Sequence, residues 1–142
     1  MGIHRAVLGH VVLNVRNLEQ SEVFYRDILG MVVSGRNPRT RMSFLTFGRE
    51  HHDIALAEVP AGVKPLADKD YPAMHHFCVY VRTPQEVDAL VPVLQEKKIP
   101  IVSGPEILEV AQNRSVSFLD PDGNRLEVAC NANKFEVRDD SV

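Results

Sequence analysis

The stretch Met74–Val81, MHHFCVYV, has the apolar character of a buried strand, yet it opens with two histidines close to its start. Gly9–Val15, GHVVLNV, has the same form, because a histidine is followed by an apolar run that ends in valine. His10 and His76 lie 66 positions apart (76 − 10), and the arginine after each run matches in the same register. This internal similarity predicts that the chain contains two copies of one unit.

A helix is expected after each of these two strands. Asn17 and Thr83 are residue types that cap helix N-termini, and Thr83 opens a capping box with proline at the first helical position. Apolar residues at helical spacing then predict helices over about 18–29 and 84–97. Gly30 is a typical end for the first helix.

Three further strands are expected after each helix. They are predicted at 31–34, 41–47 and 52–59 in the first half, and at 99–102, 114–119 and 125–130 in the second half. Each half therefore has the order βαβββ, and the fold class is predicted as α+β. We expect one domain over 1–142, with module one at about 6–59, a linker at about 60–73, module two at about 74–131 and a polar tail at 132–142.

The composition is that of an ordinary globular protein, with 142 residues, 44% of them hydrophobic and 25% charged. The formal net charge is −3 and the basic residues are scattered, which disfavours nucleic acid or an anionic membrane as a partner. No apolar run reaches the roughly 18 residues of a membrane span, and the N-terminus has no signal-peptide pattern. Cys78 and Cys130 are not spaced as a CxxC pair, so we expect reduced thiols and a cytoplasmic protein.

Side-chain alternation divides each histidine-bearing strand into two faces. The Val/Leu face is suited to pack against the helix, so the faces that carry His10 and His76 point away from the helix. These faces also carry Val12 and Asn14 in the first strand, and Cys78 and Tyr80 in the second. If the two halves pair about a pseudo-twofold axis, the two imidazoles meet.

Glu127 is a lone carboxylate between apolar neighbours in the last predicted strand. A buried carboxylate without a partner is costly, so Glu127 requires a cation. Two histidines and one carboxylate form the facial triad that suits non-haem Fe(II). The alternative is two satisfied core histidines and a glutamate at a strand end, because ligands on three separate strands leave no short-range spacing pattern.

Four stretches together resemble the vicinal oxygen chelate superfamily, which includes glyoxalase I, bleomycin and fosfomycin resistance proteins and extradiol ring-cleaving dioxygenases. They are GHVVLNV, FYRDILGM, HHFCVYV and FLDPDGNRLEV, and the resemblance covers about residues 8–128. It implies two modules that form one cup-shaped, mostly antiparallel sheet with the helices on the outer face. It also implies a homodimer and a divalent metal held by His10, His76 and Glu127.

The segment Arg49–Ala57, REHHDIALA, resembles the part of extradiol dioxygenases that carries the acid–base histidine, and the resemblance assigns this role to His52. An imidazole titrates in the range that such proton transfer needs. Strict alternation from Ala55 points His51 into the cup instead, so His52 reaches the metal only from an irregular strand start or a bulge. Ala55 stands where glyoxalase I has a fourth ligand, which leaves room for a chelating diol and O₂.

Two features of the extradiol branch are missing from this chain. The tyrosine that precedes the DPDG-type turn is replaced by Ser117 or Leu119, and the preceding loop has no histidine. Asn14, Tyr80 and Asn113 are weaker candidates for contacts with the substrate.

The predicted function is an extradiol-type dioxygenase that uses Fe²⁺, or Mn²⁺ as the alternative metal, to cleave a catecholic or vicinal-diol aromatic with O₂. A dioxygenase of this kind would take part in the degradation of aromatic compounds. The alternatives are a glyoxalase-like lyase or isomerase that stabilises an enediolate, and a metal-free sequestering protein of the bleomycin-resistance kind.

Overall fold

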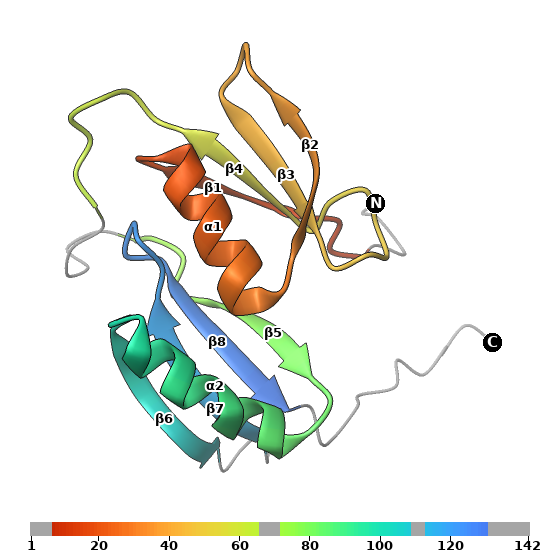
Figure 1. The fold of residues 1–142 in the computed structure, drawn as a ribbon, viewed down its shortest axis with the longest axis vertical. Coiled ribbons are helices and arrows are strands. Elements are labelled where there is room, and N and C mark those ends of the chain that lie inside the picture. The colour runs from red at the N-terminus through yellow and green to blue at the C-terminus, as the bar shows by residue number, and fades with distance from the viewer. Residues whose placement is uncertain (1–6, 66–71, 109–112, 131–142) are drawn as a thin grey trace, which may run out of the picture. The chain divides into compact units, whose positions relative to one another are not determined.

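Each half of the chain has the order β-α-β-β-β in the computed structural model, which describes residues 7–65, 72–108 and 113–130 (Figure 1). The chain divides into two compact units, Met1–Ala67 and Asp68–Val142. The first unit contains β1 (Val11–Val15), α1 (Leu18–Leu29), β2 (Val32–Asn37), β3 (Met42–Thr46) and β4 (Ile54–Glu58). The second contains β5 (Phe77–Val81), α2 (Pro84–Glu96), β6 (Ile101–Leu108), β7 (Asn113–Leu119) and β8 (Arg125–Cys130). The predicted α+β class with two βαβββ modules is confirmed.

Each unit forms its own four-stranded sheet, with the order β1-β4-β3-β2 in the first and β5-β8-β7-β6 in the second. The first strand of each unit pairs in parallel with the last, and the other two strand pairs are antiparallel. The prediction was a single, mostly antiparallel sheet, whereas the described residues form two four-stranded sheets, each of them mostly antiparallel. This topology brings the start of β1 beside the start of β4, and the start of β5 beside the start of β8.

Local capping explains why the helix boundaries were predictable. The Asn17 side chain accepts a hydrogen bond from the Gln20 backbone N–H at 2.8 Å, and Gly30 ends α1 in the left-handed region with φ 68°. Thr83 and Glu86 form the expected capping box at the start of α2. Neither helix of the described residues is long and apolar enough to cross a membrane.

The two faces of β1 and β5 differ in exposure as the alternation predicted. Leu13 and Val15 of β1 are buried, whereas His10, before the strand, is exposed. In β5, Cys78 and Tyr80 are exposed, and Phe77, Val79 and Val81 are less so. In β1 and β5 the histidine-bearing face is therefore the more exposed of the two faces.

The predicted end of the sixth strand at 102 is wrong, because β6 runs to Leu108. β6 continues through Gly104-Pro105 because it is an edge strand, where proline removes no necessary ladder bond. The pairing with β7 shifts register on both sides of Ser103, which accommodates this dipeptide. Gly104 has φ 84°, and a Cβ there would lie 2.5 Å from the Ser115 carbonyl oxygen, so only glycine fits.

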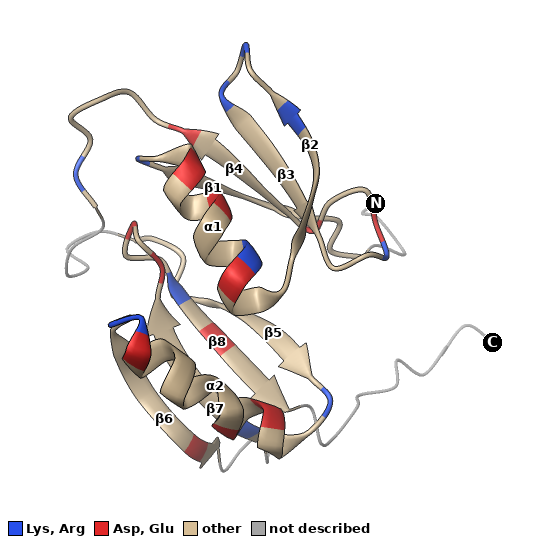
Figure 2. Cartoon of the chain, viewed as in Figure 1, with Lys and Arg blue, Asp and Glu red and all other residues tan. Residues whose placement is uncertain are grey.

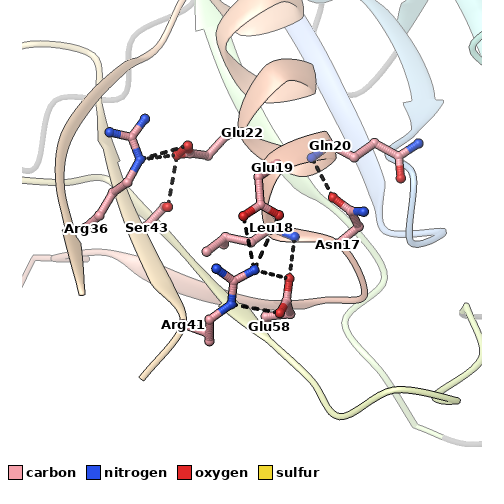
Figure 3. A network of polar contacts seen from close by, with 9 residues as sticks. All are labelled: Asn17, Leu18, Glu19, Gln20, Glu22, Arg36, Arg41, Ser43 and Glu58. Atoms are coloured by element: carbon pink, nitrogen blue, oxygen red, sulfur yellow. Dashed lines mark hydrogen bonds and ion pairs between the residues drawn. The ribbon is translucent and has the colours of Figure 1, made fainter. Parts of the chain in front are cut away.

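A buried carboxylate lies between α1 and the sheet of the first unit. Arg36 Nε donates to both oxygens of Glu22, at 3.0 and 2.9 Å, and Ser43 Oγ donates to it at 3.0 Å (Figure 3). Burial alone would raise the pKa of Glu22, but these hydrogen bonds outweigh it and hold the pKa below its ordinary value. Glu22 is therefore ionised and bonded at neutral pH.

A second ion-pair cluster fixes the start of α1. Arg41 donates from Nε and Nη2 to Glu58, each at 2.9 Å, and from Nη2 to Glu19 at 3.1 Å (Figure 3). Glu58 also accepts from the backbone N–H of Leu18 at 2.9 Å. The free N–H groups at the start of a helix favour such an acceptor, so Glu58 ties the end of β4 to α1. Figure 2 marks by colour the positions of the acidic and basic residues along these elements.

The internal repeat offers a matched test of the buried carboxylate. Asp88 occupies the position of α2 that Glu22 has in α1 (88 − 22 = 66) and pairs with Arg114 at 2.6 Å. The Asp88 side chain is 48% exposed, whereas that of Glu22 is 9% exposed. We expect Glu22→Ala to lower the free energy of unfolding by about 1.5–3 kcal/mol and Asp88→Ala by less than about 1 kcal/mol, as measured by urea unfolding.

The Glu22 effect should depend on pH. Because the folded-state pKa is lowered from 4.5, the contribution of Glu22 is present above that value and is lost as pH falls through the folded pKa. The difference between wild type and Glu22→Ala should therefore shrink when unfolding is repeated well below pH 4.5. Equal destabilisation by Glu22→Ala and Asp88→Ala at neutral pH would contradict this account.

Candidate metal centre

Two of the three predicted metal ligands meet in the second unit. β5 and β8 run side by side in parallel, in a register that places Cys78 opposite Glu127, two residues after His76. His76 Nε2 lies 3.0 Å from Glu127 Oε2. The Glu127 side chain is 11% exposed and that of His76 35% exposed, so the carboxylate is buried and the imidazole borders on solvent.

The spacing of this pair fits two neighbouring ligands of one metal ion. Donor atoms bound at about 2.1 Å with a right angle between them lie about 3.0 Å apart. An imidazole nitrogen and a carboxylate oxygen are also the donor types of the Fe(II) facial triad. Among the described residues, no three histidine, cysteine, aspartate or glutamate side chains form a group that could hold a metal. The third predicted ligand, His10, belongs to the other compact unit.

A polar row crosses the second sheet at the level of Glu127. The strand registers place Cys78, Glu127, Ser117 and Ser103 opposite one another in turn, and opposed residues point to the same face. Ser117 and Leu119, the two candidates for the tyrosine position of the extradiol branch, both lie on this face, but Ser117 is the one opposite Glu127, and it is buried.

Cys78 is exposed as a whole residue, but its thiol is desolvated. Desolvation raises the pKa of the Cys78 thiol to about 12, and the nearby Glu127 carboxylate acts in the same direction. Cys78 is therefore a neutral thiol at pH 7 beside the His76–Glu127 pair.

Both ring nitrogens of His76 have a neighbour. Nε2 faces Glu127, and Nδ1 lies 2.7 Å from Nδ1 of His75. Sequence alternation assigned the ligand role to His76 rather than His75, and the structure places His76, not His75, against the carboxylate. The contact between the two imidazoles was not foreseen, although the doublet His-His was its visible signal.

In the first unit, His52 lies against His10. The parallel register of Val11 with Ile54 brings the starts of β1 and β4 together, and the centroids of the His10 and His52 rings are 4.4 Å apart. Phe44 packs edge-on against His52 with a centroid separation of 5.0 Å. These contacts fix the His52 ring beside the predicted ligand His10.

The choice between His51 and His52 depends on where β4 begins. The strand starts at Ile54, so both histidines lie in the irregular segment before it, where strict alternation does not apply. His52 is the residue whose ring contacts His10, and His51 Nδ1 lies 2.8 Å from His52 Nδ1. Burial lowers the pKa of His52 below its ordinary value, and His10 and His51 lower it further. His52 is therefore neutral at pH 7 in the metal-free protein.

A pocket of the first unit opens beside these histidines. It is lined by Val7, Leu8, Gly9, His10, Glu50, His51 and His52. The apolar side chains Val7 and Leu8 are 92% and 85% exposed. The surroundings of the His10–His52 contact thus combine apolar surface with polar groups, as small-molecule sites commonly do.

The remaining predicted site residues have different surroundings. Asn14 of β1 and Tyr80 of β5 are exposed on the histidine-bearing faces, and Tyr80 is 59% exposed. Asn113 is buried at the start of β7, which makes it a poorer candidate for substrate contact. Ala55 is fully buried in β4 and brings no donor atom.

A known family accounts for this combination of fold and residues. The sequence profile of the Glyoxalase/Bleomycin resistance protein/Dioxygenase superfamily matches residues 7–128. The chain belongs to this superfamily. The predicted resemblance to the vicinal oxygen chelate fold is thereby confirmed.

Relatives within the superfamily have different named activities. The chain is 30% identical over 125 residues to biphenyl-2,3-diol 1,2-dioxygenase 3 of Rhodococcus globerulus, covering 85% of this chain and 61% of the relative. It is 31% identical over 122 residues to human mitochondrial methylmalonyl-CoA epimerase, covering 80% of this chain and 66% of the relative. The chain spans between 26% and 61% of the length of the dioxygenases that it matches. The level of identity therefore places the chain in the superfamily without selecting a reaction.

The fold is also shared with solved structures of the superfamily. A glyoxalase/dioxygenase from Nostoc punctiforme superposes with a TM-score of 0.71 at 24% identity, over 93% of this chain and all of the other. This likeness concerns the fold, so the reaction has to be argued from the site residues.

Proposed function

We propose that this superfamily member is a metal-dependent extradiol-type dioxygenase that cleaves a catecholic or vicinal-diol aromatic with O₂. The observation that carries the proposal is the His76–Glu127 pair, with 3.0 Å between Nε2 and Oε2. The packing of His52 against His10 supports it independently, because it places a proton-transfer group beside a ligand candidate.

The proposed ligands are His10, His76 and Glu127. His76 and Glu127 have the donor types and the spacing of two ligands of one ion. His10 is the repeat equivalent of His76 and is exposed on the matching face of its own sheet. Fe²⁺ is the metal that suits two histidines and one carboxylate with open positions, and Mn²⁺ is the alternative.

When bound, Fe²⁺ supplies a Lewis acid and a template for the diol oxygens and O₂. His52 acts as the acid–base residue in the proposed reaction. We assign the proton of neutral His52 to Nδ1, which donates to His51, so that the bare Nε2 is the nitrogen that accepts the proton of a substrate hydroxyl and later returns it. Phe44 and His10 hold the His52 ring in place for this transfer.

The substrate contacts are proposed from the exposed residues of the same faces. Asn14 offers an amide and Tyr80 a phenol, and Val7 and Leu8 offer apolar surface next to His10. An aromatic ring with an apolar substituent suits this mixture. Asn113 is the weakest of the proposed contacts because it is buried. We also propose a cytoplasmic homodimer without nucleic-acid or membrane partners.

A second candidate function is an isomerase or lyase that stabilises an enediolate. The identity to methylmalonyl-CoA epimerase favours it. Ala55 argues against its four-ligand glyoxalase form, because alanine cannot donate to a metal and the position is fully buried. A metal-free sequestering protein is the third possibility, and retention of the full candidate ligand set argues against it.

The proposal is tested by loading the protein with Fe²⁺ without oxygen and then admitting air with a panel of diols. The panel contains catechol, biphenyl-2,3-diol and a carboxylated catechol, and the readouts are O₂ consumption and yellow ring-opened products. We expect turnover of at least one apolar-substituted catechol. Solvent deuterium exchange into methylmalonyl-CoA without O₂ consumption would favour the second candidate. Tight binding of a diol without metal and without product would favour sequestration.

A further inference from the structure

We propose that Arg125 determines substrate specificity by binding a carboxylate at the end of a short apolar arm on the diol substrate. The inference rests on the proposed function and deepens it, because it names the substrate class of that same site. Its starting point is an unsatisfied donor: Arg125 Nε is buried and has no hydrogen-bond partner in the part of the chain that the structure describes. A buried polar group of this kind costs free energy until it is bonded.

Arg125 lies on the same face of the second sheet as the proposed ligand Glu127. It precedes Glu127 by two residues in β8, and side chains two residues apart on a strand point to one face. The Arg125 side chain crosses β7 on this face, because its Nη2 donates to Ser103 Oγ of β6. The guanidinium and the carboxylate of the proposed metal centre therefore border on the same surface.

Other arginines of the chain show what the Nε edge of a guanidinium binds. Arg41 donates from Nε and Nη2 to the Glu58 carboxylate, each at 2.9 Å (Figure 3). Arg114 donates from Nε to Asp88 at 2.7 Å. On the same edge Arg125 has only its Nη2 contact with a neutral hydroxyl, and no carboxylate of the described residues pairs with it. This edge has the donors that a carboxylate binds, so the ligand is the group that supplies the carboxylate.

The contact with Ser103 is one that a carboxylate can displace. The distance from Arg125 Nη2 to Ser103 Oγ is 3.3 Å, whereas an ordinary N–H···O bond measures about 2.9–3.0 Å. A carboxylate offers two acceptor oxygens, and its hydrogen bonds to a guanidinium are stronger than those of a neutral hydroxyl. Arg125 as a whole is only partly buried, so its guanidinium can turn from Ser103 toward a ligand on the exposed side.

The width of the sheet defines the length of the arm. Glu127 and Ser103 lie on strands separated by β7, so two strand spacings, about 9.5 Å, lie between them. With the diol at the Glu127 end, a carboxylate directly on the ring ends short of Ser103, whereas a two-carbon arm gives a comparable length. The methylene groups keep the substituent apolar up to its charged end. The inference therefore selects 3-(3,4-dihydroxyphenyl)propanoate over its uncharged analogues.

The binding test follows the arginine Nε–H signals of the metal-free protein by nitrogen-15 NMR. The probes are 3-phenylpropanoate and its neutral amide, which have no diol and need no metal. The Arg125 signal is assigned by its loss in Arg125→Lys, and we expect the acid to shift it saturably and the amide to leave it in place. Arg41 is the internal control, because its Nε is already bonded to Glu58. A stationary Arg125 signal, or equal shifts with both probes, would overturn the inference.

A second measurement compares kcat/KM of the Fe²⁺-loaded protein for 3-(3,4-dihydroxyphenyl)propanoate and for its primary amide. A charge-assisted pair favours the acid by about 10–100-fold, so we expect this ratio in wild type and a ratio near 1 in Arg125→Gln. Arg114→Gln is the matched control, because it removes the same charge from the neighbouring strand, where Arg114 pairs with Asp88, and should keep the wild-type ratio.

The two measurements separate this inference from the proposed function. Turnover of both compounds by wild type with equal kcat/KM would overturn the role of Arg125 and leave the dioxygenase in place. If the loaded protein turns over no diol, the proposed function fails. The response of the Arg125 signal to 3-phenylpropanoate then decides by itself whether Arg125 binds a carboxylate.

Discussion

Alanine at His76 or at Glu127 is expected to remove most of the bound metal from the protein. Loss of a residue that only supports a ligand costs about 10–100-fold in affinity, so loss of a ligand should exceed about 100-fold. The two donor atoms already stand 3.0 Å apart, and each variant leaves the other donor without its neighbour. Metal content after reconstitution with Fe²⁺ and gel filtration without oxygen measures the effect.

The controls for this prediction separate ligation from folding. His10→Ala should behave like His76→Ala if the first unit supplies the third ligand. Asp88→Ala removes another carboxylate of the second unit and should retain its metal, because Asp88 pairs with Arg114. Glu127→Gln keeps the shape of the buried side chain and should also lose metal while unfolding as wild type does. A stoichiometric metal content in any one of the three ligand variants would remove that residue from the set.

Alanine at His52 is expected to abolish most of the turnover while leaving metal binding intact. Loss of a positioned proton-transfer group costs about 10²–10⁴-fold in rate. Because His52 contacts His10 through its ring and is not a proposed ligand, His52→Ala should bind Fe²⁺ about as well as wild type. The measurements are the steady-state rate on the best diol of the panel and the metal content of the same sample.

His51→Ala is the control for the acid–base assignment. His51 precedes β4 as His52 does, but its ring contacts Phe44 and His52. Its loss should reduce turnover far less than the loss of His52. Near-normal turnover in His52→Ala together with an inactive His51→Ala would transfer the role to His51. Normal turnover in both variants would leave the dioxygenase proposal without its acid–base residue.

The parts of the fold that were predictable from the sequence are those that local chemistry determines. Asn17 and Thr83 mark the helix starts because their side chains accept hydrogen bonds from backbone N–H groups three residues later. The exposed faces of β1 and β5 follow from alternation, since only one face of each strand meets the core. The pairing of His76 with Glu127 was expected from the family resemblance, and its geometry required the parallel register of β5 and β8.

Other features depend on contacts between residues that lie far apart in the sequence, which local sequence patterns do not predict. Glu22 is bonded to Arg36 and Ser43, which lie 14 and 21 residues away, and no spacing rule connects them. Alternation also pointed to His51, but it does not apply there because the segment before Ile54 is not a strand, and it is the ring of His52 that contacts His10.

Isotope labelling tests dioxygenation by the metal-loaded protein most directly. The Fe²⁺-loaded wild type is allowed to turn over biphenyl-2,3-diol, or the best diol of the panel, under ¹⁸O₂, and the ring-opened product is analysed by mass spectrometry. We predict a product that contains both atoms of ¹⁸O₂ and is not formed by Glu127→Gln or by His76→Ala. A ring-opened product without label, or no product from any diol by protein that holds its full complement of Fe²⁺, would contradict the proposed function.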